Sequence, residues 1–343
     1  MSINNLDNLD NLIIGIPREL KENEYRVSLV PDEVEKLISN LKIKVIVQKG
    51  AGIGAHYTDE DYKNKGAIII DTIDEVYKEA NLIIKVKEPQ ESEYQFINEN
   101  HTIMTFFHFG GNPKLKEAMV KSNACCIPYE TIKDDNNNYP ILLPMSIIAG
   151  ESSMIEAINF IINNANIDNT QIRAIPITII GVGNAGKASA FKARELGYTN
   201  INLIDRDYGK IKELERFDFK IYEMNETNLS LLLKKSMIII GSIYNYNQSA
   251  TRLITDDLLS LMPENSIFMD IAIDQGGMTS QSIPTTITAP IIKFNQTNIY
   301  CVPNIPSTVP REASQKLSKA IYPYVITILS LDSNEKKKRF MVM

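Results

Sequence analysis

Short apolar runs alternate with amphipathic segments along most of the chain. The runs that predict strands cover residues 12–16, 44–48, 67–70, 82–86, 175–180, 202–204, 237–241, 266–271 and 299–302. The segments that predict helices include residues 32–41, 59–65, 147–162, 187–196 and 313–329. Strands that alternate with helices are typical of α/β domains with parallel sheets. We therefore expect an α/β fold with two Rossmann-like α/β domains and an interdomain cleft.

A glycine-rich turn follows one of these strands. Gly181, Gly183 and Gly186 stand between the apolar run 175–180 and the helical segment 187–196. In a dinucleotide-binding unit the first glycine permits a tight turn, the second lets the backbone approach a pyrophosphate, and the third lets the helix pack closely on the sheet. The N-terminus of the helix then holds the phosphate charge. The pattern predicts a dinucleotide site rather than a structural glycine turn.

An acidic residue at the end of the next strand indicates which dinucleotide binds. Asp205 would accept hydrogen bonds from the adenosine ribose and repel a 2′-phosphate, which favours NAD over NADP. Arg206 is the opposing signal, because a basic side chain at this position accommodates a 2′-phosphate. NAD is therefore the expected cofactor, with NADP left open by Arg206.

The chain of 343 residues is long enough for two domains with a core each. The polar stretch 163–171 after the long apolar segment is a natural hinge. We expect a substrate (catalytic) domain made of residues 1–140 and 311–343, and an NAD-binding Rossmann domain over residues 141–310.

The composition limits the possible binding partners of the protein and its cellular compartment. The net charge of −6 argues against nucleic acid or an anionic membrane as a partner. No apolar stretch approaches the length of a bilayer-spanning helix, the best candidate being residues 322–331, and residues 1–11 lack the basic start of a secretory signal. Three cysteines predict reduced thiols in the cytoplasm, and Cys125 with Cys126 lacks the ligand spacing of a zinc site, so no metal is expected.

Several charged side chains stand where ligands usually bind. Lys85 and Lys87 alternate at the end of a strand before a proline, where lysines either protect a sheet edge or face a ligand. His108 lies between phenylalanines before a double glycine, which fits a buried core histidine as well as a neutral base. Asp270 and Asp274 end an apolar run before Gln-Gly-Gly, and the two together favour a site over a helix cap.

Separate motifs in the same order resemble alanine dehydrogenase, from about residue 13 to residue 329. They are GIPRE (15–19) followed by NEYRV (23–27), KVKEP (85–89), PMS (144–146), DIAIDQGG (270–277) and YCVPN (300–304). The chain departs from the family in two places: residues 163–174 contain no glycine where a glycine-rich loop is usual, and Glu151-Ser152-Ser153 stands where a basic residue is expected.

The resemblance assigns roles residue by residue. It implies that Arg26 and Lys87 hold the substrate carboxylate, with Lys87 also reaching the keto or imino oxygen, and that His108 and Asp274 are the acid/base pair. The NAD site would be lined by Ser146, Gly181, Gly183, Gly186, Asp205 and Asn304. These chemistries suit the side chains, because arginine offers a planar fork to a carboxylate and histidine titrates near neutral pH. The alternative for Arg26 is a surface ion pair with Glu24.

The resemblance implies reversible NAD-dependent oxidative deamination of a small L-amino acid, with L-alanine converted to pyruvate and ammonia, by a cytoplasmic homo-oligomer (dimer or hexamer). The first alternative is an opine-type dehydrogenase, similar to carboxyethylornithine synthase or saccharopine dehydrogenase, which condenses a 2-oxo acid with an amino acid. Gly110 and Gly111 would leave room for that larger amine. The second is a catalytically silent NAD(H)-binding protein. The proton-translocating transhydrogenase shares the architecture but lacks a histidine matching His108.

Overall fold

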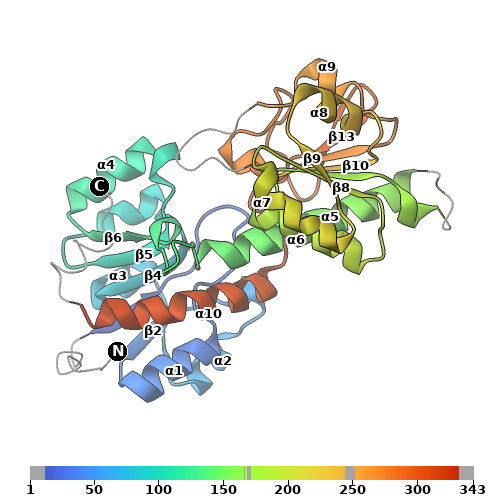
Figure 1. Cartoon of the computed structure of the whole chain (residues 1–343). Helices are drawn as coiled ribbons and strands as arrows, with labels where there is room; N and C mark the ends of the chain where they lie inside the picture. Colours follow the sequence, from blue (N-terminus) through green and yellow to red (C-terminus); the bar gives the residue numbers. More distant parts are fainter. Residues whose placement is uncertain (1–11, 166, 168–170, 244–251, 332–343) are drawn as a thin grey trace. The chain divides into compact units, whose positions relative to one another are not determined.

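The computed structural model describes residues 12–165, 167, 171–243 and 252–331. The chain forms two compact units (Figure 1): unit 1 contains Met1–Met145 and Ser307–Met343, and unit 2 contains Ser146–Pro306. Residues 1–11, in which no secretory signal was expected, lie outside the described residues. The assignment of a substrate domain and an NAD domain, with limits at 140/141 and 310/311, stays a prediction.

Unit 1 is built on a six-stranded parallel sheet with the order β3-β2-β1-β4-β5-β6. Its strands are β1 (Ile13–Ile16), β2 (Lys44–Gln48), β3 (Ile68–Ile70), β4 (Leu82–Lys87), β5 (Thr102–Phe106) and β6 (Cys125–Pro128). After β3 the chain crosses the sheet to place β4 on the other side of β1. In sheets of this kind, ligands bind beyond the carboxyl ends of the strands at such a reversal point.

Five helices belong to unit 1: α1 (Pro31–Leu41), α2 (Asp59–Asn64), α3 (Ile73–Glu79), α4 (Pro113–Ser122) and α10 (Pro310–Leu329). Shorter 3-10 turns are η1 (Ile53–Ala55), η2 (Glu91–Phe96), η3 (Phe109–Gly111) and η4 (Tyr129–Thr131). One buried cluster joins the sheet to α3 and α4 through Val76, Ile83, Ile103, Leu115 and Met119. The C-terminal helix α10, red in Figure 1, packs against α1.

Unit 2 is built on a seven-stranded sheet with the order β12-β13-β11-β10-β7-β8-β9, parallel except for the antiparallel pair of β12 and β13. Its strands are β7 (Ile177–Ile180), β8 (Ile201–Asp205), β9 (Lys220–Glu223), β10 (Ile238–Gly241), β11 (Ile267–Asp270), β12 (Ile291–Phe294) and β13 (Thr297–Tyr300). The strand order reverses between β7 and β10, because β8 and β9 lie on one side of β7 and β10 lies on the other. Both units therefore have the predominantly parallel Rossmann-like α/β architecture that the sequence predicted.

Alternate residues of the central strands supply the two faces of this second sheet. Ile238 and Ile240 of β10 join one core cluster, whereas Ile239 between them joins the other, as the pleat of a strand requires. The helices of unit 2 are α5 (Leu142–Asn164), which begins in unit 1, α6 (Asn184–Glu195), α7 (Tyr208–Lys212), α8 (Glu226–Leu233) and α9 (Asp256–Leu259). Its 3-10 turns are η5 (Ile172–Ala174), η6 (Glu213–Phe217) and η7 (Ile271–Gln275), and η8 (Ile305–Thr308) crosses the limit between the units.

Helix α5 overturns one expectation from the sequence. By length and composition it is able to cross a membrane, whereas no such segment was expected. Glu151 and Glu156 interrupt the apolar run of α5 in the sequence, but the mean hydropathy of the helix stays high. Half of its most apolar window is buried within the protein. Core helices of water-soluble proteins meet the same criteria, so this finding by itself assigns no membrane role.

Candidate active site

The predicted site residues of unit 1 follow three neighbouring strands. Arg26 lies in the loop after β1, Lys87 is the last residue of β4, and His108 comes two residues after the end of β5. Because β1, β4 and β5 are adjacent and parallel, their carboxyl ends share one edge of the sheet. The reversal point between β1 and β4 is at this edge, where α/β sheets bind ligands.

Arg26 is held by a buried ion pair rather than a surface one. Its Nε lies 2.7 Å from Oε1 of Glu24 and its Nη2 lies 2.5 Å from Oε2, a bidentate geometry. Both residues are buried, and Nη1 approaches Sδ of Met145 at 3.2 Å. The pairing with Glu24 that the sequence allowed is therefore present, but not at the surface. A substrate carboxylate would meet Arg26 at an edge other than the one that Glu24 occupies.

Serines of the C-terminal segment fix the loop that carries Arg26. The backbone N–H groups of Tyr25, Val27 and Val30 donate to the hydroxyl oxygens of Ser307, Ser314 and Ser318 at 3.0–3.1 Å. Ser314 and Ser318 are one helical turn apart on α10 and are fully buried. The sequence analysis missed these residues; their one signal was two serines spaced four apart in an otherwise apolar helix face.

Lys85 and Lys87 have different surroundings. Lys85 is fully buried, with Nζ 3.0 Å from Oε1 of Glu93 and 3.4 Å from Oε2 of Glu19. The register of β4 against β5 shifts between Ile84 and Lys87, which interrupts the regular alternation on which the sequence prediction rested. The structure therefore makes Lys85 part of an internal ion cluster, and Lys87 remains the candidate for substrate.

Glu19 links that ion cluster to the end of β4. Its Oε1 accepts the backbone N–H of Val86 at 2.6 Å and its Oε2 accepts that of Lys87 at 3.3 Å. Burial raises the pKa of Glu19 to about 7, against the opposing effect of the positive charge on Lys85. A carboxylate is thus placed directly under the backbone of the predicted substrate lysine.

His108 is not the buried core residue that its aromatic neighbours suggested. The residue is exposed, has a left-handed backbone with φ of 49°, and its ring stacks on Phe106 with ring centres 5.8 Å apart. Desolvation, followed by the positive charges of Lys87, Lys21 and Arg26, lowers the pKa of His108 to about 3. A neutral imidazole able to accept a proton follows.

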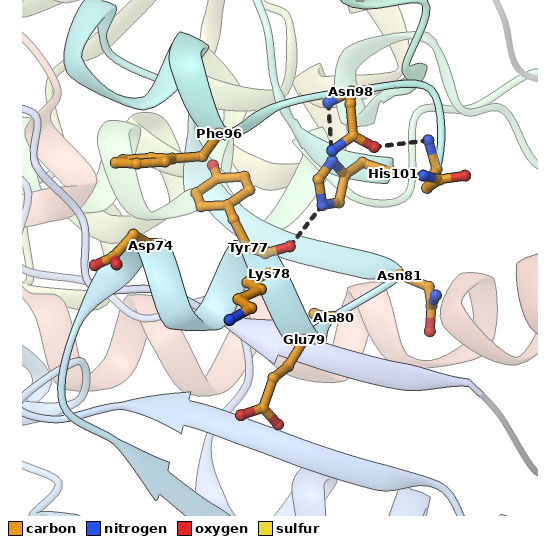
Figure 2. A pocket seen from close by; sticks show the side chains of 10 residues that line it. Asp74, Tyr77, Lys78, Glu79, Ala80, Asn81, Phe96, Asn98 and His101 are labelled. Carbon is orange, nitrogen blue, oxygen red and sulfur yellow. Dashed lines mark hydrogen bonds between the residues drawn. The ribbon is translucent and has the colours of Figure 1, made fainter.

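His101, rather than His108, is a buried core histidine. His101 is buried, and it lines a cavity of about 430 Å³ at the amino-terminal ends of the strands, away from the edge that carries Lys87 and His108. Figure 2 shows both ring nitrogens of His101 in use: Nδ1 accepts the backbone N–H of Asn98 at 3.0 Å, and Nε2 donates to the carbonyl of Tyr77 at 2.7 Å. Its hydrogen-bonding capacity is saturated, so this pocket offers no reactive group comparable to His108.

In unit 2 the glycine motif has the geometry that a dinucleotide requires. Gly181 has φ of 85°, a left-handed conformation that favours glycine. A Cβ on Gly186 would lie 2.0 Å from the carbonyl oxygen of Gly181, so only glycine lets α6 approach β7 this closely. A Cβ on Gly183 would meet nothing within 4 Å. The backbone at the N-terminus of α6 is therefore open to a phosphate group.

The carboxylate of Asp205 lies beside the same turn. Its Oδ2 accepts the backbone N–H of Val182 at 2.6 Å, and its Oδ1 accepts that of Asp207 at 3.0 Å. Each carboxylate oxygen has a second lone pair, so ribose hydroxyl groups can still be bound. Arg206 is exposed next to it. The residues present fit an adenosine ribose without a 2′-phosphate.

Two further predicted residues of unit 2 lie together. The exposed carboxylate of Asp274, at the end of η7, accepts the backbone N–H of Asn304 at 3.2 and 3.3 Å from its two oxygens. Asp270 is instead buried and holds the turn, because it accepts the N–H groups of Ala272 and Met278 at 3.1 and 2.7 Å. Ser146 is a half-buried residue of α5.

The predicted residues are divided between the two units. Arg26, Lys87 and His108 share the strand edge of unit 1. The glycine turn with Asp205, and Asp274 with Asn304, belong to unit 2. The acid/base pairing of His108 with Asp274 joins residues of different units and stays a prediction.

Comparisons with known proteins identify the family of the chain. Residues 15–149 match the family model "Alanine dehydrogenase/PNT, N-terminal domain", and residues 164–341 match "Alanine dehydrogenase/PNT, C-terminal domain". The alanine dehydrogenase of Mycolicibacterium smegmatis is 32% identical over 326 residues, which cover 92% of this chain and 87% of that protein. The alanine dehydrogenase of Staphylococcus epidermidis is 34% identical over 322 residues, which cover 91% of this chain and 86% of the relative.

Solved structures show the same likeness. An L-alanine dehydrogenase superposes with a TM-score of 0.88 at 27% identity, covering 96% of this chain and 92% of that one. A transhydrogenase from Sinorhizobium meliloti, with a TM-score of 0.81 at 21% identity and coverage of 93% and 94%, shares the fold. Both family models and the relatives thus cover nearly the whole chain, and the protein belongs to the alanine dehydrogenase/PNT family.

Proposed function

We propose that this chain is an NAD-dependent amino-acid dehydrogenase that reversibly converts L-alanine to pyruvate and ammonia. The observation that supports this most directly is the grouping of Arg26, Lys87 and His108 at the carboxyl ends of β1, β4 and β5. Two cations suit a small carboxylate, and a neutral imidazole beside them suits a proton acceptor. NAD, when bound, supplies the acceptor for the hydride.

The residues of this chain would then divide the work as follows. Arg26 and Lys87 bind the substrate carboxylate, and Lys87 also orients the keto or imino group. His108 and Asp274 take up and return the protons of the amine and of the attacking water. Desolvation, together with the positive charge of Lys87, keeps His108 neutral before each proton transfer. The turn Gly181, Gly183 and Gly186, with Asp205, Ser146 and Asn304, would hold the dinucleotide.

The finer predictions on assembly and compartment belong to the same proposal. We propose a cytoplasmic homo-oligomer, a dimer or a hexamer, that binds no nucleic acid and no membrane. The chain has three cysteines, an odd number that argues against a disulfide framework and suits a reducing compartment. Multi-angle light scattering of the purified chain measures the subunit number. A monomer at micromolar concentration would contradict the assembly.

A cofactor-oxidation screen tests the activity itself. NADH or NADPH is mixed with the protein, a set of 2-oxo acids, and either ammonium or an amino acid as the amine donor. We expect NADH to be oxidised with pyruvate and ammonium, and L-alanine to reduce NAD. Turnover only with an amino-acid donor would instead favour the opine-type alternative. Tight NADH binding without any turnover would favour the silent binding protein.

A further inference from the structure

The three predicted site residues of unit 1 share a backbone feature. Each donates its own N–H to the carboxylate of a glutamate that is buried or nearly so. The pairs are Arg26 with Glu24 at 3.0 Å, Lys87 with Glu19 at 3.3 Å, and His108 with Glu130 at 2.6 Å. The repetition after three neighbouring strands indicates a common means of holding the functional side chains.

The pair of Glu130 and His108 has the shortest contact of the three. Glu130 lies in η4, directly after β6, and both of its oxygens are used: Oε1 accepts from His108 at 2.6 Å and Oε2 accepts from Phe107 at 3.3 Å. One carboxylate thus brackets two consecutive N–H groups just beyond the end of β5. Burial raises the pKa of Glu130, and the N–H groups of His108 and Phe107 oppose that rise because they stabilise the ionised carboxylate.

The backbone of His108 needs such support. Its φ of 49° places it in the left-handed region, which is unfavourable for a residue with a Cβ because that atom crowds the following carbonyl. The residue is exposed, and it stands outside β5 and immediately before η3. The bonds from Glu130 oppose relaxation of this backbone. They therefore fix the point from which the imidazole is directed beside Lys87.

We propose that Glu130 is a positioning residue for His108, and that its carboxylate holds the left-handed backbone from which the imidazole reaches the substrate. This inference rests on the proposed function, in which His108 exchanges protons with the substrate. Glu130 itself touches only the backbone of its partners in this arrangement. Its effect on the reaction is therefore transmitted through His108.

The test is a double-mutant cycle in the full-length protein. Glu130→Ala should lower kcat by about 100-fold, because a misplacement of about 1 Å costs that much, while the KM for pyruvate changes little. Glu130→Gln keeps the oxygen that accepts from His108 and should restore most of kcat. In a His108→Ala background, Glu130→Ala should cause little further loss, because the group that it positions is already gone.

Asp61→Ala is the matched control. Asp61 also accepts a backbone N–H, that of Thr58 at 2.7 Å, but at the start of α2. Its loss should leave kcat unchanged. Equal losses from Glu130→Ala in the wild-type and His108→Ala backgrounds would mean a purely structural role and would overturn the proposal. A wild-type kcat in Glu130→Ala would overturn it as well.

A readout without turnover separates this proposal from the proposed function. If the wild-type protein fails to oxidise NADH in the screen, the function fails, and the titration of the His108 ring by NMR then decides the positioning role. Desolvation, and then the cations Lys87, Lys21 and Arg26, lower the pKa of a held ring. Release of the ring in Glu130→Ala should raise that pKa towards the ordinary value, and Asp61→Ala should not. An unchanged titration in Glu130→Ala would overturn the proposal.

Discussion

The carboxylate of Asp205 and the backbone N–H of Val182 lie 2.6 Å apart, which ties the acid at the end of β8 to the glycine turn after β7. The acid is therefore fixed in place before a ligand binds. A fixed negative charge at this position binds a ribose diol and opposes a 2′-phosphate without any rearrangement of the chain.

We expect the wild-type protein to bind NADH more tightly than NADPH. In Asp205→Asn the oxygen that accepts from Val182 can remain while the charge is lost, so the preference for NADH should shrink by about 10-fold or more, since hydrogen bonds to a charged group are worth about 1.5–3 kcal/mol. Fluorescence titration with both nucleotides measures it. Asp218→Asn, at an exposed turn of the same unit, should keep the wild-type ratio. A wild-type preference for NADPH would mean that Arg206 dominates.

Lys87→Ala and His108→Ala should each abolish most turnover and leave NADH affinity nearly intact. Loss of general acid/base catalysis alone costs roughly 10²- to 10⁴-fold. Steady-state kinetics with pyruvate and ammonium, together with an NADH titration of each variant, separates the two effects. Near-normal turnover in His108→Ala would leave the exposed, left-handed His108 without a catalytic role.

The sequence predicted the glycine site more completely than the catalytic edge, because the two depend on different ranges of contact. Gly181, Gly183 and Gly186 act through their own backbone, so their spacing alone carries the signal. Glu130 reaches His108 across 22 residues, and Glu19 reaches Val86 across 67. Such pairs exist only once the strands are in order, and a single sequence does not state that order.

Strands β5, β9 and β12 were not predicted, because the sequence shows no continuous apolar run at these positions. β9 and β12 are the two edge strands of the second sheet, and their residues are half-buried or exposed. Without two buried faces they lack the continuous apolar run that marked β7 or β10. β5 was obscured differently, since its threonines interrupt the apolar run 102–106, although the strand is buried almost throughout.

The stability of the protein should depend on the protonation of Glu19. Its pKa is raised from 4.5 to about 7 in the folded chain, so the folded state binds more protons than the unfolded state between these values. The resulting stabilisation is present below pH 4.5 and is lost as the pH rises through 7, with an upper limit of about 3 kcal/mol. Glu19→Gln has no proton to lose at this position. The Tm of the variant relative to that of wild type should therefore rise, by roughly several degrees, between pH 5 and pH 8.

Differential scanning calorimetry at the two pH values makes this comparison. Glu22→Gln, an exposed position in the same loop, serves as the control and should follow the wild-type pH dependence. A constant Tm difference between Glu19→Gln and wild type would mean that Lys85 keeps Glu19 ionised in the folded chain, which contradicts the raised pKa.

Oxidation of L-alanine should rise steeply with pH. The substrate amine must be deprotonated before it can become an imine, whereas His108, with its lowered pKa, is neutral throughout the neutral range. The rise of kcat/KM with pH therefore reports the deprotonation of the substrate amine. Glu130→Gln should show the same rise with L-alanine. A profile with a midpoint near 6.5, the ordinary value for histidine, would show that His108 titrates normally and that the cations around it do not lower its pKa.

The space beside His108 allows a test of whether the amine donor is ammonia or an amino acid. Gly110 and Gly111 are exposed, and a Cβ on either would meet nothing within 4 Å, so a larger side chain is tolerated there without strain. Ammonia needs no such space, and we expect Gly110→Leu to oxidise NADH with pyruvate and ammonium at close to the wild-type rate. An opine-type enzyme would place its second amino acid beside this turn and should lose that activity in the same variant. Assays of wild type and Gly110→Leu with ammonium, ornithine and lysine distinguish the two. If ammonium is inert with wild type, while ornithine or lysine supports turnover that Gly110→Leu removes, the donor is an amino acid and alanine deamination is not the reaction of this site.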